Sequence, residues 1–292
     1  MQNLVRMMDA DGTLCVIAAD TTETVREMHR LHGTAKVVSA ALGRLLTAAS
    51  LMGSILKGEK DSITLKVSAD GAASPITAVS DSNGNVRGYA GRNDVVLPLN
   101  TKGKLDVSGA VGKNGTLTVI KDLGMRDPYV GQVPLVSGEI AEDVTAYYAA
   151  SEQTPSVCGL GVLVDPDTES ILCAGGFLIQ LLPSALEDTI EKVERGLENI
   201  KPVTTMLFEN MTSEEICRAV LPEFELTVLD SAEVGYRCTC SRERMKNALR
   251  ATGKQALSEM AEDENTEVTC NFCNRQYTFP QAEMQEMAEA CE

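Results

Sequence analysis

Four cysteines in the last fifth of the chain have the spacing of metal ligands. Cys238 and Cys240 form a C-T-C pair, and Cys270 and Cys273 form a C-N-F-C pair after 29 intervening residues. A C-x-x-C pair across a turn is common in tetrahedral zinc sites, and two pairs separated by such a loop can close one site. The alternative is four buried small hydrophobic groups. Because their neighbours are Thr, Ser, Asn and Arg, a poor pattern for a core, the sequence favours one zinc ion bound by the four thiolates.

The C-T-C pair is unusual for a purely structural zinc site, because structural zinc sites mostly use two C-x-x-C pairs. A disulfide across one intervening residue is strained, and strained disulfides are labile. The four cysteines could therefore exchange a metal ion for two disulfides.

Basic side chains crowd these cysteines in an otherwise acidic chain. Residues 237–254 contain one acid, Glu243, and six bases: Arg237, Arg242, Arg244, Lys246, Arg250 and Lys254. Four thiolates around a divalent zinc leave a net charge of −2. We expect this stretch and Arg275 to offset that charge and to lower the pKa values of the thiols. The alternative is a solvated basic helix face unrelated to sulfur.

The remaining candidate residues give weaker signals for a metal or catalytic site. His29 and His32 share a helix face, but no carboxylate pattern supports a metal site there, and a surface role is favoured. Four cysteines within apolar stretches are interpreted as packing residues: Cys15, Cys158, Cys173 and Cys217. Cys291 is an extra thiol with no assigned partner. No G-x-S-x-G motif or thioredoxin-like C-x-x-C is present, so the sequence does not predict an enzyme.

Composition narrows the class of protein. The chain has 292 residues, enough for about two domains, and a formal net charge of −16. Such a charge argues against a nucleic-acid-binding surface. Asp9 and Asp11 interrupt any signal peptide, and Arg44 makes residues 39–56 a buried helix rather than a membrane span. Nine cysteines without an export signal indicate a reducing cytoplasm and metal or redox chemistry.

The chain is expected to have an α+β fold in three parts. Residues 1–180 alternate strand and helix signals, with hairpins turning at Asp11-Gly12, Asn83-Gly84 and Asn114-Gly115, a helix over 34–58 and a final strand pair over 157–182. Residues 181–235 are expected to be a helical linker. Residues 236–292 are expected to form a small zinc domain with a hairpin around its second cysteine pair and a short terminal helix.

The linker is predicted to contain two amphipathic helices. The first, over 183–200, has an apolar stripe of Leu186, Ile190, Val193, Leu197 and Ile200. The second begins at Thr212, where Glu215 completes a capping box. Because these helices have too few apolar residues for a core, they must dock on the first domain. The stripe is expected to be hidden while docked and to bind other proteins once released.

Several long motifs, in order along essentially the whole chain, are similar to one known family. They are GRLLTAASLMGSILKG, VRGYAG, GKNGTLTVIKDLG, PYVGQVPLVSGEIAEDVTAYYAASEQTPS, LGVLV and VTCNFCNRQYTF. With these motifs and its C-x-C and C-x-x-C pairs, the chain resembles the HslO-type redox-regulated heat-shock chaperones of bacteria, the 33 kDa chaperonin family.

The resemblance implies an ATP-independent holdase that binds unfolding proteins during oxidative stress. It implies that zinc on Cys238, Cys240, Cys270 and Cys273 keeps the reduced protein inactive. On oxidation the zinc leaves, disulfides Cys238–Cys240 and Cys270–Cys273 form, and the linker unfolds to expose a client-binding surface. Active forms in the family are homodimers.

Two other functions share the cysteine pattern. A zinc-ribbon protein would bind nucleic acid, which the net charge of −16 opposes. A dithiol oxidoreductase would turn over disulfides of a substrate. The sequence predicts no membrane partner for any of the three.

Overall fold

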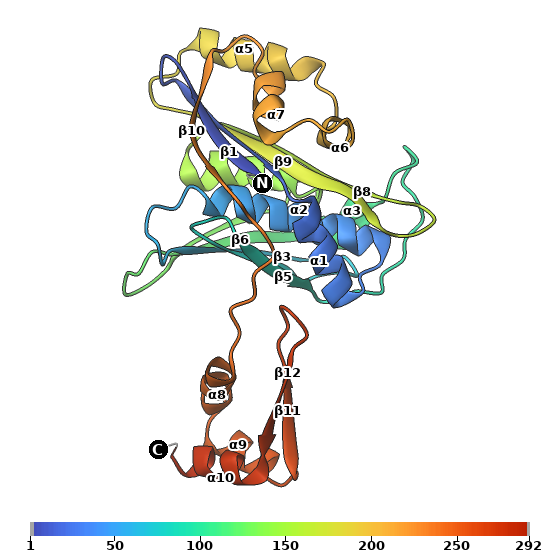
Figure 1. Cartoon of the computed structure of the whole chain (residues 1–292), viewed down its shortest axis with the longest axis vertical. Helices are drawn as coiled ribbons and strands as arrows, with labels where there is room; N and C mark the ends of the chain where they lie inside the picture. Colours follow the sequence, from blue (N-terminus) through green and yellow to red (C-terminus); the bar gives the residue numbers. More distant parts are fainter. Residues whose placement is uncertain (1–2, 291–292) are drawn as a thin grey trace. The chain divides into compact units, whose positions relative to one another are not determined.

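The computed structural model describes residues 3–290, and the chain divides into two compact units, Met1–Arg237 and Cys238–Glu292 (Figure 1). The larger unit contains two five-stranded antiparallel sheets and helices, and the smaller contains one hairpin and helices. This arrangement confirms the predicted α+β fold. Because the helices of residues 181–235 lie within the larger unit, the division into three domains stays a prediction.

The two sheets of the larger unit each pair distant parts of the chain. Sheet A contains, in spatial order, β10 (Leu226–Ala232), β1 (Leu4–Asp9), β2 (Leu14–Asp20), β9 (Ile171–Leu181) and β8 (Ser156–Val164). Sheet B contains β5 (Val86–Ala90), β4 (Ile76–Asp81), β3 (Ser62–Ala69), β6 (Gly115–Asp122) and β7 (Tyr129–Pro134). The hairpins predicted at Asp11-Gly12 and Asn83-Gly84 are confirmed, as is the pair β8–β9.

Helix α2 (Lys36–Gly53) lies between the two sheets and is buried on nearly every side (Figure 1). It contacts β4 and β5 of one sheet and β8 and β9 of the other, and α1 (Thr22–His32) packs beside it. A helix buried all round needs apolar or small residues on every face, which explains its lack of amphipathicity. The expectation of a buried helix is confirmed, although the helix ends at Gly53 rather than Gly58. In the part of the chain that the structure describes, no helix has the length and apolar content to cross a membrane.

The hairpin predicted at Asn114-Gly115 is wrong. Residues Val107–Val111 form the short helix α3, because the Asp106 carboxylate accepts a hydrogen bond from the Gly109 amide and caps its first turn. Strand β6 instead forms its hairpin with β7. After β7, α4 (Ala141–Tyr147) continues into a π-helical turn, η1 (Tyr148–Glu152).

Three helices cover the face of sheet A that points away from α2 (Figure 1). They are α5 (Glu187–Glu198), α6 (Val203–Phe208) and α7 (Ser213–Val220), and Thr212 and Glu215 form the predicted capping box of α7. Strand alternation assigns the two faces: Leu14 and Val16 of β2 contact these helices, whereas Ile17 belongs to the core around α2. We call the cluster on the helix face the linker core; its buried members from the helices are Val193, Val203, Met206, Leu207, Ile216, Cys217 and Val220.

The apolar stripe of the first linker helix is only partly covered. Val193 is 4% exposed, and Leu197 and Ile200 are partly buried against the linker core. Leu186 is 73% exposed and Ile190 is 40% exposed. The expectation that docking hides the whole stripe is therefore wrong for these two residues; Leu186 precedes the first turn of α5, as its N-cap.

The last residues of the larger unit are hydrogen-bonded to the edge of sheet B. Residue Tyr236 bridges Val86 of β5 in parallel, and the Val86 carbonyl accepts from the Arg237 amide at 2.8 Å. The Tyr236 hydroxyl donates to the Gly88 carbonyl at 2.9 Å and lies 3.2 Å from His32 Nε2. The chain is thus held on the larger unit up to the residue before Cys238.

The smaller unit is built around few apolar side chains. It contains α8 (Arg242–Arg250), α9 (Lys254–Met260), the hairpin β11 (Asn265–Thr269) and β12 (Gln276–Pro280), and α10 (Gln281–Glu289). Its core consists of Leu249, Leu257, Ala261, Phe279, Met284, Met287 and Ala288. The hairpin and the terminal helix confirm the prediction for this segment.

Candidate metal centre

The structure brings together the four predicted cysteines at one end of the smaller unit. Their sulfur atoms all lie within 4.8 Å of one another, with Cys238 and Cys270 at 3.7 Å and Cys240 and Cys273 at 3.4 Å. Four sulfurs bound tetrahedrally to zinc at about 2.3 Å would be about 3.8 Å apart. None of these four cysteines is in a disulfide. The donor set and its spacing therefore fit a tetrahedral thiolate site.

A tight turn between β11 and β12 places one pair of cysteines. The Cys270 carbonyl accepts from the Asn274 amide at 2.8 Å and from the Cys273 amide at 3.3 Å, and Asn274 has a left-handed backbone with φ 56°. Asparagine tolerates that conformation better than most residues. The turn directs both sulfurs to the same side of the hairpin end.

The other pair lies on the segment that leads into α8. Ser241, directly after Cys240, caps this helix by accepting from the Arg244 amide. The Arg244 side chain returns to donate to the carbonyl of Thr239, between the two cysteines, at 2.9 Å. These bonds fix the C-x-C segment against the start of α8.

Three of the thiols have shifted pKa values, and the shifts differ in direction. Burial raises the pKa of Cys238 and, to a smaller extent, the pKa of Cys273. Burial also opposes ionisation of Cys240, but hydrogen bonds from Tyr277 and from neighbouring thiols outweigh it and lower the pKa of Cys240 to about 7. Of these three thiols, Cys240 is the one that ionises most readily near neutral pH.

The basic residues around the cluster mostly pair with other groups, which corrects the expectation from sequence. Arg242 and Lys246 both bind the Glu283 carboxylate, and Arg250 lies 3.8 Å from Glu243. Arg275 is the basic residue whose charge interacts with Cys240 and Cys273. Three of the six basic residues of 237–254 thus form ion pairs within the small unit, and the charge that interacts with the thiols comes from Arg275 in the β11–β12 hairpin.

Sequence reasoning missed Tyr277, whose hydroxyl donates a hydrogen bond to Cys240 Sγ at 3.1 Å. Tyr277 lies on β12, and the charge of Arg275 interacts with its hydroxyl. The signal in the sequence is its position four residues after Cys273, on a strand leaving the metal-binding turn.

The cysteines outside the cluster are separate from this chemistry. Burial raises the pKa of Cys158 and of Cys217 to about 12 and that of Cys173 to about 11, and the pKa of Cys15 is also raised by burial. Buried thiols with raised pKa values are unreactive, which supports their interpretation as packing residues. Cys291 lies outside the described residues. The surface role favoured for His29 and His32 is wrong: His32 is buried and His29 is half-buried, and both hydrogen-bond to hydroxyl groups of the larger unit.

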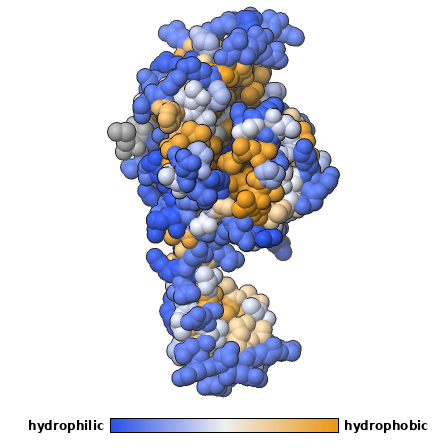
Figure 2. All heavy atoms as spheres, turned by 90° about the vertical axis from the view of Figure 1, so that its right-hand side faces the viewer, coloured by the Kyte–Doolittle hydropathy of each residue, from blue (hydrophilic) through white to orange (hydrophobic). Residues whose placement is uncertain are grey.

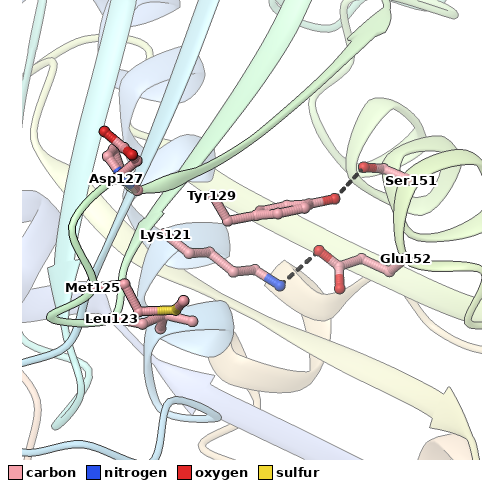
Figure 3. A pocket seen from close by; sticks show the side chains of 8 residues that line it. Lys121, Leu123, Met125, Asp127, Tyr129, Ser151 and Glu152 are labelled. Atoms are coloured by element: carbon pink, nitrogen blue, oxygen red, sulfur yellow. Dashed lines mark hydrogen bonds and ion pairs between the residues drawn. The ribbon is translucent and has the colours of Figure 1, made fainter.

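A shallow pocket of about 640 Å³ lies beside the β6–β7 hairpin of the larger unit (Figure 3). Lys121 pairs with Glu152 at 2.6 Å, and the Tyr129 hydroxyl lies 3.0 Å from that of Ser151. Because Glu152 also accepts from the Tyr147 hydroxyl, the polar groups satisfy one another. This cluster braces the hairpin against η1.

Hydrophobic side chains are exposed on the larger unit even with its helices docked. Figure 2 shows apolar surface gathered on one side of it. The most exposed large hydrophobic residues include Val96, Leu99, Met125, Val130, Val136 and Phe208. Patches of this kind commonly mark interaction sites.

The fold and the cysteine cluster together define an α+β protein whose small C-terminal unit brings four free cysteines within reach of one metal ion. A family model described as Hsp33 protein matches residues 2–280, and the chain belongs to this family of chaperones. It is 49% identical to the 33 kDa chaperonin of Clostridium botulinum (strain Alaska E43 / Type E3), over 94% of each chain. It is 47% identical to the 33 kDa chaperonin of Lachnoclostridium phytofermentans, over 97% of each.

A crystal structure supports the same assignment. The 33 kDa chaperonin (heat shock protein 33 homolog) of Thermotoga maritima matches with a TM-score of 0.90 and 36% identity, over 99% of each chain. The family resemblance expected from the sequence is therefore confirmed, and with it a chaperone whose partners are client proteins.

Proposed function

We propose that this chaperone is a redox-regulated, ATP-independent holdase of the cytoplasm, inactive when reduced and zinc-bound. The observation that carries the proposal is the cluster of four free cysteines on a small unit, joined directly to the segment that ends at Arg237. Zinc would be bound by Cys238, Cys240, Cys270 and Cys273, one ion per monomer. The protein acts by binding clients and catalyses no reaction.

Zinc would supply much of the folding free energy of the small unit. Structural zinc contributes about 10–16 kcal/mol in small zinc-binding peptides. The core of this unit has a single fully buried aromatic side chain, Phe279, and a domain of this size seldom folds on such a core alone. Loss of the metal would therefore unfold the unit.

Oxidation would remove the metal by converting its ligands into the disulfides Cys238–Cys240 and Cys270–Cys273. In the folded cluster all four sulfurs are within 4.8 Å, so proximity alone does not select a pairing. Once the unit unfolds, sulfurs separated by one or two residues meet more often than sulfurs separated by about thirty, because short loops cost less entropy to close. This supports the local pairing.

Loss of the small unit's fold would release the helices of 181–235 from sheet A. Those helices are held by the linker core and by the anchored segment that ends at Arg237, next to Cys238. Undocking would expose the linker core. Together with Leu186 and Ile190, which are already exposed, the linker core would form the client-binding surface. Exposed apolar surface of this kind would also support the homodimer expected for the active form.

An aggregation assay tests the proposal. A thermally unfolding client is followed by light scattering with the reduced zinc-loaded protein, and with protein treated with peroxide under mild heat. We expect protection from the oxidised protein alone, with one zinc released per monomer. A Cys15→Ser variant is the matched control and should behave as the unchanged protein. Equal protection by reduced and oxidised protein would contradict the proposal.

A further inference from the structure

The hydrogen bond between Tyr277 and Cys240 suggests a control on the chemistry of the centre. Tyr277 Oη lies 3.1 Å from Cys240 Sγ and donates to it. The side chain is half-buried, while the neighbouring Arg275 is exposed. The charge of Arg275 interacts with Tyr277, Cys240 and Cys273. The hydroxyl therefore meets the sulfur from outside the set of four ligands.

Strand pairing fixes this geometry. Tyr277 is paired with Val268 across the β11–β12 ladder, and Phe279, two residues on, is fully buried in the core of the small unit. Alternate residues of a strand share one face, so the buried Phe279 anchors the face on which Tyr277 also lies. Arg242 packs over the Phe279 ring, with 4.4 Å from its guanidinium carbon to the ring centroid. The phenol therefore has little freedom to turn away from Cys240.

We propose that Tyr277 is a positioning residue that slows attack of hydroperoxides on Cys240 and strengthens metal binding by the four-cysteine centre. This inference rests on the proposed zinc site. A hydrogen bond to a thiolate sulfur removes electron density and occupies one of its exposed lone pairs, so the sulfur becomes a poorer nucleophile. Groups that hydrogen-bond to metal ligands in this way also orient them and raise metal affinity.

The step that Tyr277 slows is the first one of oxidation. The Cys240 sulfur attacks one oxygen of the hydroperoxide, the O–O bond breaks, and the other oxygen leaves as hydroxide or alkoxide and takes up a proton. Cys240 then has a sulfenic acid. A neighbouring thiolate attacks this sulfur and expels hydroxide, so that two thiolates have given two electrons to one peroxide.

The test compares Tyr277→Phe with a matched control, Thr266→Val. Thr266 is on the paired strand β11, and its hydroxyl donates to the Met260 carbonyl at 3.1 Å, so both variants lose one hydroxyl of the same hairpin. Each protein is loaded with zinc and treated with excess hydrogen peroxide, and released zinc is followed with a chromophoric chelator. We expect release from Tyr277→Phe to be faster by at least about threefold, and Thr266→Val to match the unchanged protein.

Two further readouts separate the hydroxyl's role from a loss of fold. In competition with a chelator, Tyr277→Phe should bind zinc about tenfold more weakly. With Co²⁺ in excess, its sulfur-to-metal charge-transfer band should move to longer wavelength, because the thiolate donor level rises when the hydrogen bond is lost. Release rates within twofold of each other together with an unmoved band would overturn the inference. If the unchanged protein binds no zinc, the proposed function fails with it.

Discussion

Replacing Ile216 by alanine should activate the reduced protein. Ile216 lies on α7, is 0% exposed and belongs to the linker core, which joins the helices to sheet A. The substitution removes buried methyl groups and leaves a cavity in that interface. In the proposed account, whatever weakens docking of α5–α7 should expose client-binding surface without oxidation.

The size of the effect follows from the burial. Truncation of a fully buried isoleucine to alanine costs about 2–5 kcal/mol. With about 3 kcal/mol lost from docking alone, the undocked population would rise about 150-fold, because each 1.4 kcal/mol is a factor of ten. Hydrogen exchange of α7 amides in the reduced, zinc-loaded protein should show a matching fall in protection.

The matched control is Ile63→Ala. Ile63 is 1% exposed but lies on β3, in the core around α2. It should lower the stability of the larger unit by a similar amount and leave the reduced protein unable to prevent client aggregation. If both variants activate equally, general destabilisation and not undocking is the cause, and the reasoning about the linker core is refuted.

Three further predictions concern other parts of the chain. Asp143→Ala should lower the free energy of unfolding by about 3 kcal/mol in thermal denaturation, because the buried carboxylate accepts from three or more backbone amides, including those of Val136 and Ile140; Asp143→Asn should lose less. Removal of zinc by a chelator should abolish the near-UV signal and exchange protection of Cys238–Glu292, while sheet B stays protected. Tyr236→Phe should increase amide exchange at Val86 and Arg237 without changing the zinc content, because the hydroxyl that bonds to Gly88 is lost. Unchanged exchange would show that the backbone bridge between Tyr236 and Val86 alone holds this segment.

Local signals made much of the fold predictable. The turn at Asp11-Gly12 joins strands that pair with their immediate neighbours, and the capping box at Thr212 needs only four consecutive residues. The four metal-ligand cysteines could also be predicted, because their spacing is visible in the sequence itself. Such features depend on neighbours in the chain and require no knowledge of the tertiary structure.

Features that depend on distant pairing were missed. Strand β10 pairs with β1, more than 200 residues earlier, and was not predicted, although Leu226, Thr227 and Val228 alternate apolar and polar side chains. The segment of the short α3 was predicted to be the first strand of a hairpin because the Asn-Gly pair at 114–115 is a common hairpin turn, and the cap at Asp106 was not recognised. Tyr277 was not singled out in the sequence, because only the fold reveals that its hydroxyl meets Cys240.

Hydrogen exchange on active protein tests the central claim most directly. The oxidised chaperone would be mixed with an unfolding client, and amide protection over 183–235 would be compared with that in the reduced, zinc-loaded protein. The account predicts that α5, α6 and α7 lose protection on oxidation, that part of it returns when client is bound, and that α2 and sheet B stay protected throughout. Full protection of 183–235 in oxidised protein that still holds its client would contradict the account.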